Sequence, residues 1–152
     1  MRCLTYAECA AWCVAHDYPI IEVDHYGRPA PAVLNSYLHF PLVYPEDSGR
    51  KVQLSRNVVS RLLTSGELLL WIGDWAVWPT SQHMPLFTRF RQAFGETRPL
   101  IEAPGHVVGV EQLEDAVSVL TVAMLFFWDC HVFTSRDPDL FSSRHMMSGT
   151  HS

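Results

Sequence analysis

Three residues near the start of the sequence have the types and the spacing of metal ligands. Cys9, Cys13 and His16 are four and three positions apart. On a helix these positions lie along one face, and two thiolates with an imidazole form a ligand set that suits zinc. The sequence has no Cys-x2-Cys pair, however, and a buried cysteine is an ordinary core residue. We therefore interpret the three as core side chains, with zinc binding as the alternative.

Asp129 and His131 form the second group that could do chemistry. They lie in the apolar run LFFWDCHVFT at 125–134, which is typical of a strand. Residues two apart on a strand share a face, whereas the adjacent Cys130 and His131 face opposite sides and cannot form a catalytic dyad. The pattern favours a polar pair on the sheet surface. The alternative is a small hydrolase or zinc-dependent enzyme in which this pair acts together with the N-terminal cysteines and His16.

The most unusual segment is 71–78, where three tryptophans surround an acidic turn sequence. A Gly-Asp pair between two apolar runs favours a tight hairpin turn at Gly73 and Asp74. Tryptophan is favoured at interaction surfaces because it buries a large area with few torsions. This segment therefore predicts a surface that binds a partner, and the alternative is that its tryptophans cap the core. The predicted partner-binding residues are Asp74, Trp75, Trp78 and His83.

Local signals mark the helices that would position these residues. Thr5 and Glu8 match a capping box, in which each side chain accepts a hydrogen bond from the backbone amide of the other. Ser55 is the expected N-cap of a second helix. Apolar residues at helical spacing and helix-ending glycines complete the pattern. The predicted helices cover 5–16, 55–65, 81–94 and 110–124.

Short apolar or β-branched runs between turn residues predict the strands. The run at 67–72 is apolar almost throughout, which indicates a strand buried on both faces. Residues 45–49 are expected to form an exposed turn, and Gly105–Gly109 a flexible lead-in to the last helix. The predicted strands cover 20–23, 37–44, 67–72, 75–78, 125–134 and 140–144.

These elements predict one compact domain of the α/β or α+β class, with about four helices and a mainly antiparallel sheet. The 152 residues, 48% of them hydrophobic, are close to the size of a single domain and suffice for a core. We expect the domain to cover 1–141. The polar segment 142–152 is expected to be a frayed tail.

Charge limits the class of partner. Eleven basic and sixteen acidic residues give a net charge of −5, and the cations are scattered rather than gathered in the basic stripe of nucleic-acid binders. The sequence contains no Gly-x-Gly-x-x-Gly, Walker or His-Glu-x-x-His motif. We therefore expect no cofactor and no nucleic acid, and a protein as the partner.

Two further features indicate the compartment. The sequence starts without the apolar run of a secretory signal, and its longest apolar stretch, 116–128, is shorter than a membrane span. Four irregularly spaced cysteines are typical of free thiols in a reducing compartment. We expect a cytoplasmic protein that does not bind membranes.

In its small size, acidity and cytoplasmic character, the chain resembles the immunity proteins that neutralise bacterial polymorphic toxins. The resemblance implies a non-enzymatic protein that neutralises a toxin by direct contact, with a basic toxin domain as the expected partner. It concerns overall character, so it assigns no binding residues.

Overall fold

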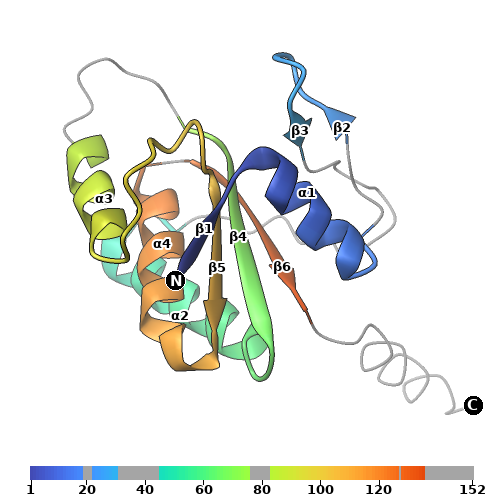
Figure 1. The fold of residues 1–152 in the computed structure, drawn as a ribbon. Helices are drawn as coiled ribbons and strands as arrows, with labels where there is room; N and C mark the ends of the chain where they lie inside the picture. Colours follow the sequence, from blue (N-terminus) through green and yellow to red (C-terminus); the bar gives the residue numbers. More distant parts are fainter. Residues whose placement is uncertain (19–21, 31–44, 76–82, 127, 136–152) are drawn as a thin grey trace, which may run out of the picture.

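The computed structural model describes residues 1–18, 22–30, 45–75, 83–126 and 128–135. The described residues form four α-helices and an open, four-stranded antiparallel sheet in an α+β arrangement, as the sequence predicts (Figure 1). The helices are α1 (Tyr6–Ala15), α2 (Ser48–Leu62), α3 (His83–Gln92) and α4 (Leu113–Leu125), the last preceded by a 3-10 turn, η1 (Val110–Gln112). The sheet has the order β1 (Arg2–Leu4), β5 (Gly105–Gly109), β4 (Glu67–Asp74) and β6 (Asp129–Thr134). A separate hairpin pairs β2 (Glu22–Val23) with β3 (Pro29–Ala30).

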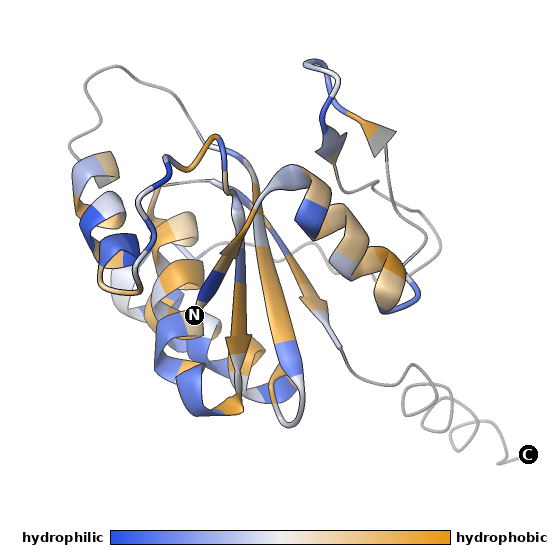
Figure 2. Cartoon of the chain, in the orientation of Figure 1, coloured by the Kyte–Doolittle hydropathy of each residue, from blue (hydrophilic) through white to orange (hydrophobic). Residues whose placement is uncertain are grey.

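The sheet lies between α1 on one face and α2, α3 and α4 on the other (Figure 1). Apolar residues run along both central strands, β4 and β5 (Figure 2). The side chains of β4 alternate between two hydrophobic clusters, and all of those from Leu68 to Ile72 are fully buried. The strand is therefore buried on both faces, as its unbroken apolar run predicts.

The two clusters are named here by the helices that cover them. The α1 cluster consists of Leu4, Cys9, Trp12, Cys13, Leu69, Trp71 and Val107. The α2–α4 cluster packs apolar residues of α2, α3 and α4 against Leu68, Leu70, Ile72 and Val108. None of the described helices has the length and apolar character needed to cross a membrane.

The capping box at the start of α1 is confirmed. The Thr5 amide donates to Glu8 Oε2 at 2.8 Å, and the Glu8 amide donates to Thr5 Oγ1 at 3.2 Å. These two bonds satisfy amides that have no partner inside the helix. The helix ends at Ala15 and points Cys9 and Trp12 into the α1 cluster.

The second helix begins seven residues earlier than predicted. Asp47 is its N-cap, and the Asp47 Oδ1 accepts a hydrogen bond from the Arg50 amide at 2.9 Å. The predicted exposed turn at 45–49 thus contains the cap and the first helical residues. Ser55, the expected cap, is instead fully buried in the middle of α2, and its hydroxyl contacts Met124 Sδ at 3.6 Å. The predicted start of this helix was wrong because Asp47 and Ser55 are both of residue types that cap helices. The structure selects the earlier one, Asp47.

The predicted hairpin turn at Gly73 and Asp74 is also wrong. Both residues belong to β4, which continues to Asp74 and pairs with β6 across a β-bulge between Ile72 and Asp74. Gly73 lies against the ring of His131, where an added Cβ would be 3.3 Å from Nε2. The glycine therefore provides room beside the neighbouring strand rather than a chain reversal. Trp75 follows β4 outside any strand, and 76–78 lie outside the described residues.

The segment expected to be a flexible lead-in, Gly105–Gly109, is an ordered internal strand, β5. It pairs with β4 on one side and with β1 on the other. No sequence pattern predicted β1, which has three residues. A Cβ at Gly105 would collide with Cys9 Sγ and lie 3.1 Å from Leu4 Cβ, so this glycine lets α1 approach the sheet.

The remaining predicted elements differ mainly at their ends. The predicted helix at 110–124 is confirmed as η1 followed by α4, and the third helix ends at Gln92 rather than 94. The last long strand begins at Asp129 because α4 extends to Leu125. The predicted strands at 37–44 and 140–144 and the tail at 142–152 lie outside the described residues.

Candidate functional site

Two aspartates meet across the sheet at the bulge. Asp74, the last residue of β4, is directly opposite Asp129, the first residue of β6, and both are exposed. Asp129 shares its face with His131, and the bulge between Ile72 and Asp74 interrupts the alternation of β4 where Asp74 pairs with Asp129. In the described part of the chain, neither carboxylate forms an ion pair. Among the described residues, this end of the sheet therefore carries two acidic side chains for which no ion pair with Lys or Arg is found.

Trp75 extends this acidic end with an aromatic surface. Its side chain is half-buried and packs against the α2–α4 cluster. Of the four predicted partner-binding residues, the structure thus places Asp74 and Trp75 next to each other. Trp78 lies outside the described residues, as does the side chain of His83, the first residue of α3. We call Asp74, Trp75 and Asp129 the acidic edge.

Asp129 and His131 share a face, as predicted, and Cys130 and Val132 pack on the opposite face against the α2–α4 cluster. His131 is half-buried and opposite Trp71. Trp71 is fully buried, and its indole N–H has no hydrogen-bond partner in the described part of the structure. The alternation predicted for this strand is confirmed.

The three residues considered as zinc ligands belong to the packing of α1. Cys9 and Cys13 are fully buried, and burial raises the pKa of both thiols, that of Cys13 to about 12. The His16 ring packs against Trp12 with ring centroids 4.0 Å apart and planes tilted by 31°, and its Nδ1 is 2.7 Å from the Trp12 carbonyl oxygen. Among the residues that the structure describes, no group of three or more His, Cys, Asp or Glu side chains could hold a metal ion.

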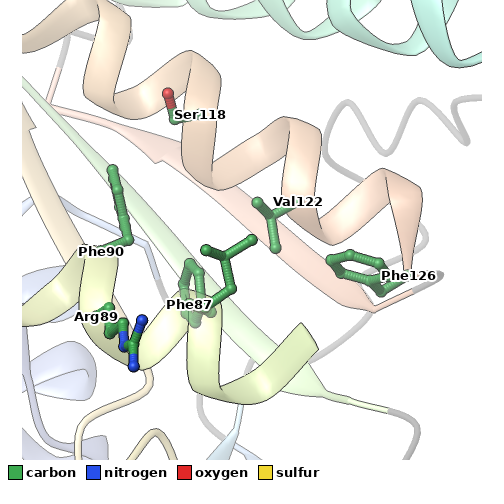
Figure 3. Close-up of a pocket in the computed structure, with 7 residues that line it drawn as sticks. Phe87, Arg89, Phe90, Ser118, Val122 and Phe126 are labelled. Carbon is green, nitrogen blue, oxygen red and sulfur yellow. The ribbon is translucent and has the colours of Figure 1, made fainter. Parts of the chain in front are cut away.

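A second surface, which sequence reasoning missed, is an apolar groove of about 390 Å³ between α3 and α4 (Figure 3). Apolar residues at helical spacing predicted the helix at 81–94, but not which element its apolar side would face. Phe87 is buried, whereas Leu86 on the rim is 68% exposed. The lining residues are Leu86, Phe87, Arg89, Phe90, Ser118, Val122 and Phe126. We call this the α3–α4 groove.

Comparison with known proteins does not assign the chain to a family. No protein-family profile, no curated protein and no solved structure shows significant similarity to it.

Proposed function

We propose that this chain is a non-enzymatic protein-binding domain of the immunity type, which neutralises a toxin by direct contact. The observation that carries the proposal is the acidic edge, where the exposed Asp74 of β4 is paired with the exposed Asp129 of β6. Like charges directly opposite each other in a sheet destabilise the fold. A lysine or arginine from a partner, placed between the two carboxylates, would convert this repulsion into two attractive contacts.

The other features of the surface fit the same partner. Trp75, next to Asp74, offers an amphipathic ring of the kind enriched at binding hot spots. The net charge of −5 would steer a basic protein toward the chain and increase the rate of encounter. The partner is therefore a basic domain, which in this proposal is the toxin. The free cysteines of the described residues fit a reducing cytoplasm as the place of action.

The enzyme alternative gains no specific support. It requires Asp129 and His131 to act with the N-terminal cysteines and His16. Two of these cysteines, Cys9 and Cys13, are buried, and their raised pKa values favour the unreactive protonated form. His16 packs against Trp12.

The proposal predicts a separation of binding from stability. The double variant Asp74→Asn, Asp129→Asn should bind the toxin domain encoded beside its gene about tenfold more weakly, a loss of about 1.4 kcal/mol. It should also unfold at an equal or slightly higher temperature, because the repulsion is removed. Calorimetric titration measures the first effect and thermal denaturation the second.

The matched control is Glu102→Gln, Glu111→Gln, which removes two exposed acidic charges elsewhere. It should keep both the affinity and the ability of the co-expressed chain to restore growth of cells that make the toxin. Equal affinities of the two double variants would contradict the role of the acidic edge. A wild-type chain that neither binds nor protects would contradict the immunity function itself.

A further inference from the structure

A cluster of polar side chains lies where β1, β5 and α3 meet. Cys3 of the edge strand β1 is directly opposite His106 of β5, so their side chains share a face of the sheet (Figure 1). The ring of His106 meets Phe87, which places this face on the side of α3. Arg91 of α3 is 2% exposed, and its guanidinium acts on the Cys3 thiol both as a charge and as a hydrogen-bond donor. We call Cys3, Arg91 and His106 the thiol cluster.

Two buried polar atoms of this cluster have no hydrogen-bond partner among the described residues. Arg91 donates from Nη2 to the Ala103 carbonyl at 2.7 Å, but its Nε has no acceptor. His106 is fully buried, with Nδ1 3.4 Å from the Leu70 carbonyl oxygen and Nε2 without a partner. Buried polar groups are nearly always hydrogen-bonded, because an unpaired one costs the energy of its desolvation. The two atoms therefore indicate a polar group that these side chains are built to hold.

The two unpartnered atoms are of opposite kinds. Arg91 Nε carries a proton and can only donate. A carbonyl oxygen only accepts, so His106 Nδ1 carries the imidazole proton toward Leu70, and Nε2 is left as an acceptor. Burial lowers the pKa of His106, which keeps the ring neutral and Nε2 unprotonated. The group that fits must accept from Arg91 and donate to His106, and a hydroxyl does both.

We propose that Cys3 is a site of oxidation, where hydrogen peroxide converts the thiol to a sulfenic acid that Arg91 and His106 hold. The Cys3 sulfur attacks one peroxide oxygen, and an S–O bond forms as the O–O bond breaks. The second oxygen takes up the thiol proton and leaves as water, so the sulfur loses the two electrons that the peroxide gains. The new hydroxyl accepts from Arg91 Nε and donates to His106 Nε2. This proposal does not depend on the immunity function.

Among the four cysteines, Cys3 is the one best placed to react. Burial raises the pKa of every thiol, but for Cys3 the rise is opposed by positive charge, chiefly that of Arg91. Cys9 and Cys13 are fully buried, and burial raises the pKa of Cys130 to about 12. Cys3 is partly exposed at the edge of the sheet. Because oxidation follows thiolate character and access, Cys3 should be oxidised first.

The same cluster disfavours the next oxidation, to sulfinic acid. A sulfinate is an anion whose oxygens only accept, so it would face His106 Nε2 with no proton between them. Glu96, whose carboxylate pairs with Arg98 at 2.7 Å, adds a negative charge that opposes an anion on Cys3. The thiol cluster therefore favours the neutral sulfenic acid over the sulfinate.

Treatment of the full-length chain with hydrogen peroxide in the presence of dimedone, which alkylates sulfenic acids, tests the proposal. Mass spectrometry of the cysteine-containing peptides should find the adduct on Cys3 about tenfold more often than on Cys9, Cys13 or Cys130, because each unit of pKa changes the thiolate fraction about tenfold. Without dimedone, the same measurement gives the ratio of sulfinic to sulfenic acid on Cys3.

Variants separate the two contacts. His106→Leu removes the acceptor and should raise the ratio of sulfinic to sulfenic acid on Cys3 about tenfold, whereas His106→Gln keeps an acceptor oxygen and should restore the ratio of the wild type. Arg91→Gln should slow the formation of the dimedone adduct about tenfold, because it removes the cation beside the thiol. Arg89→Gln, a change at an exposed arginine of the same helix, is the matched control and should alter neither quantity.

Two results would overturn the proposal. The first is an adduct spread evenly over the four cysteines of the wild type, a result that requires no variant to fold. The second is a ratio of sulfinic to sulfenic acid that is the same in the wild type, His106→Leu and His106→Gln, because the cluster would then not hold the sulfenic acid. If His106→Leu does not fold, equal rates of adduct formation in Arg91→Gln and Arg89→Gln would contradict the role of the cluster.

Discussion

His106 is an ionisable side chain in the interior of the sheet. It is fully buried on β5, its Nδ1 is 3.4 Å from the Leu70 carbonyl oxygen, and its ring meets Phe87 edge-on. Burial, assisted by the positive charge of Arg91, lowers the pKa of His106 to about 3. Arg91 is itself buried and donates to the Ala103 carbonyl at 2.7 Å. The native fold therefore holds this imidazole neutral.

This depressed pKa makes the free energy of unfolding depend on pH. The unfolded chain protonates His106 below about pH 6.5, whereas the folded chain does so only near pH 3. Stability is thus complete above about pH 6.5 and falls by about 1.4 kcal/mol per pH unit below it. Between about pH 7 and pH 5 the wild type should lose about 2 kcal/mol more than His106→Leu, as measured by urea denaturation.

Most carboxylates do not titrate between about pH 7 and pH 5, because their ordinary pKa values are near 4. His25→Gln, a change at an exposed histidine, is the control and should keep the pH dependence of the wild type. Parallel stability curves for the wild type and His106→Leu would contradict the account. If His106→Leu does not fold, His106→Gln provides the same comparison.

At the scale of elements, the sequence predicted what local signals determine. The α1 capping box involves Thr5 and Glu8, three residues apart, and the buried strand at 67–72 shows its apolar run directly. Apart from the start of α2, where Asp47 rather than Ser55 is the N-cap, the errors concern pairing over long distances. Gly73 and Asp74 have the local appearance of a turn, but their backbone pairs with β6, which lies far along the chain. Likewise, β5 contains two glycines and was expected to be flexible, but it pairs with β1 on one side and with β4 on the other.

The candidate site shows the same limit. The sequence of 71–78 was enough to single out Asp74 and Trp75. It could not show which residue of another strand pairs with Asp74. Asp129 entered the sequence analysis as part of a possible catalytic pair, and only the register of β4 against β6 places it opposite Asp74. The α3–α4 groove forms only where α3 packs beside α4, and β5 separates these two helices in the sequence. Predicting it would require knowledge of which helix faces which.

The packing of α1 against the sheet depends on a close approach at Gly105. An added Cβ would collide with Cys9 Sγ and crowd Leu4, and both neighbours are buried. Overpacking of a buried site costs about 1–3 kcal/mol, so Gly105→Ala should lower the free energy of unfolding by that amount. Urea denaturation measures the change.

A second substitution shows whether the collision is the cause. Cys9→Ala removes the sulfur that the new Cβ would meet, so the double variant Cys9→Ala, Gly105→Ala should be more stable than the sum of the two single changes predicts. Strict additivity would mean that Gly105→Ala acts through another contact, such as the one with Leu4.

The whole molecule has two hydrophobic clusters that share one strand. Leu68, Leu70 and Ile72 belong to the α2–α4 cluster, and Leu69 and Trp71 to the α1 cluster. Because the side chains of β4 alternate between the faces, neither cluster can lose this strand without exposing the other. The two layers of helices should therefore unfold together, although they lie on opposite faces of the sheet.

Thiol labelling can test this cooperativity, because the α1 cluster contains cysteines and the α2–α4 cluster has one packed against it. Cys13 is buried in the α1 cluster and Cys130 packs against the α2–α4 cluster. Burial raises the pKa of each thiol to about 12, so both should react slowly with iodoacetamide in the native protein, since the thiolate is the reactive form. Mass spectrometry of the two cysteine-containing peptides over a urea series should give coincident transitions and one free energy of unfolding. If Cys13 becomes labelled at lower urea than Cys130, then α1 detaches before the rest of the sheet, and β4 does not couple the two layers.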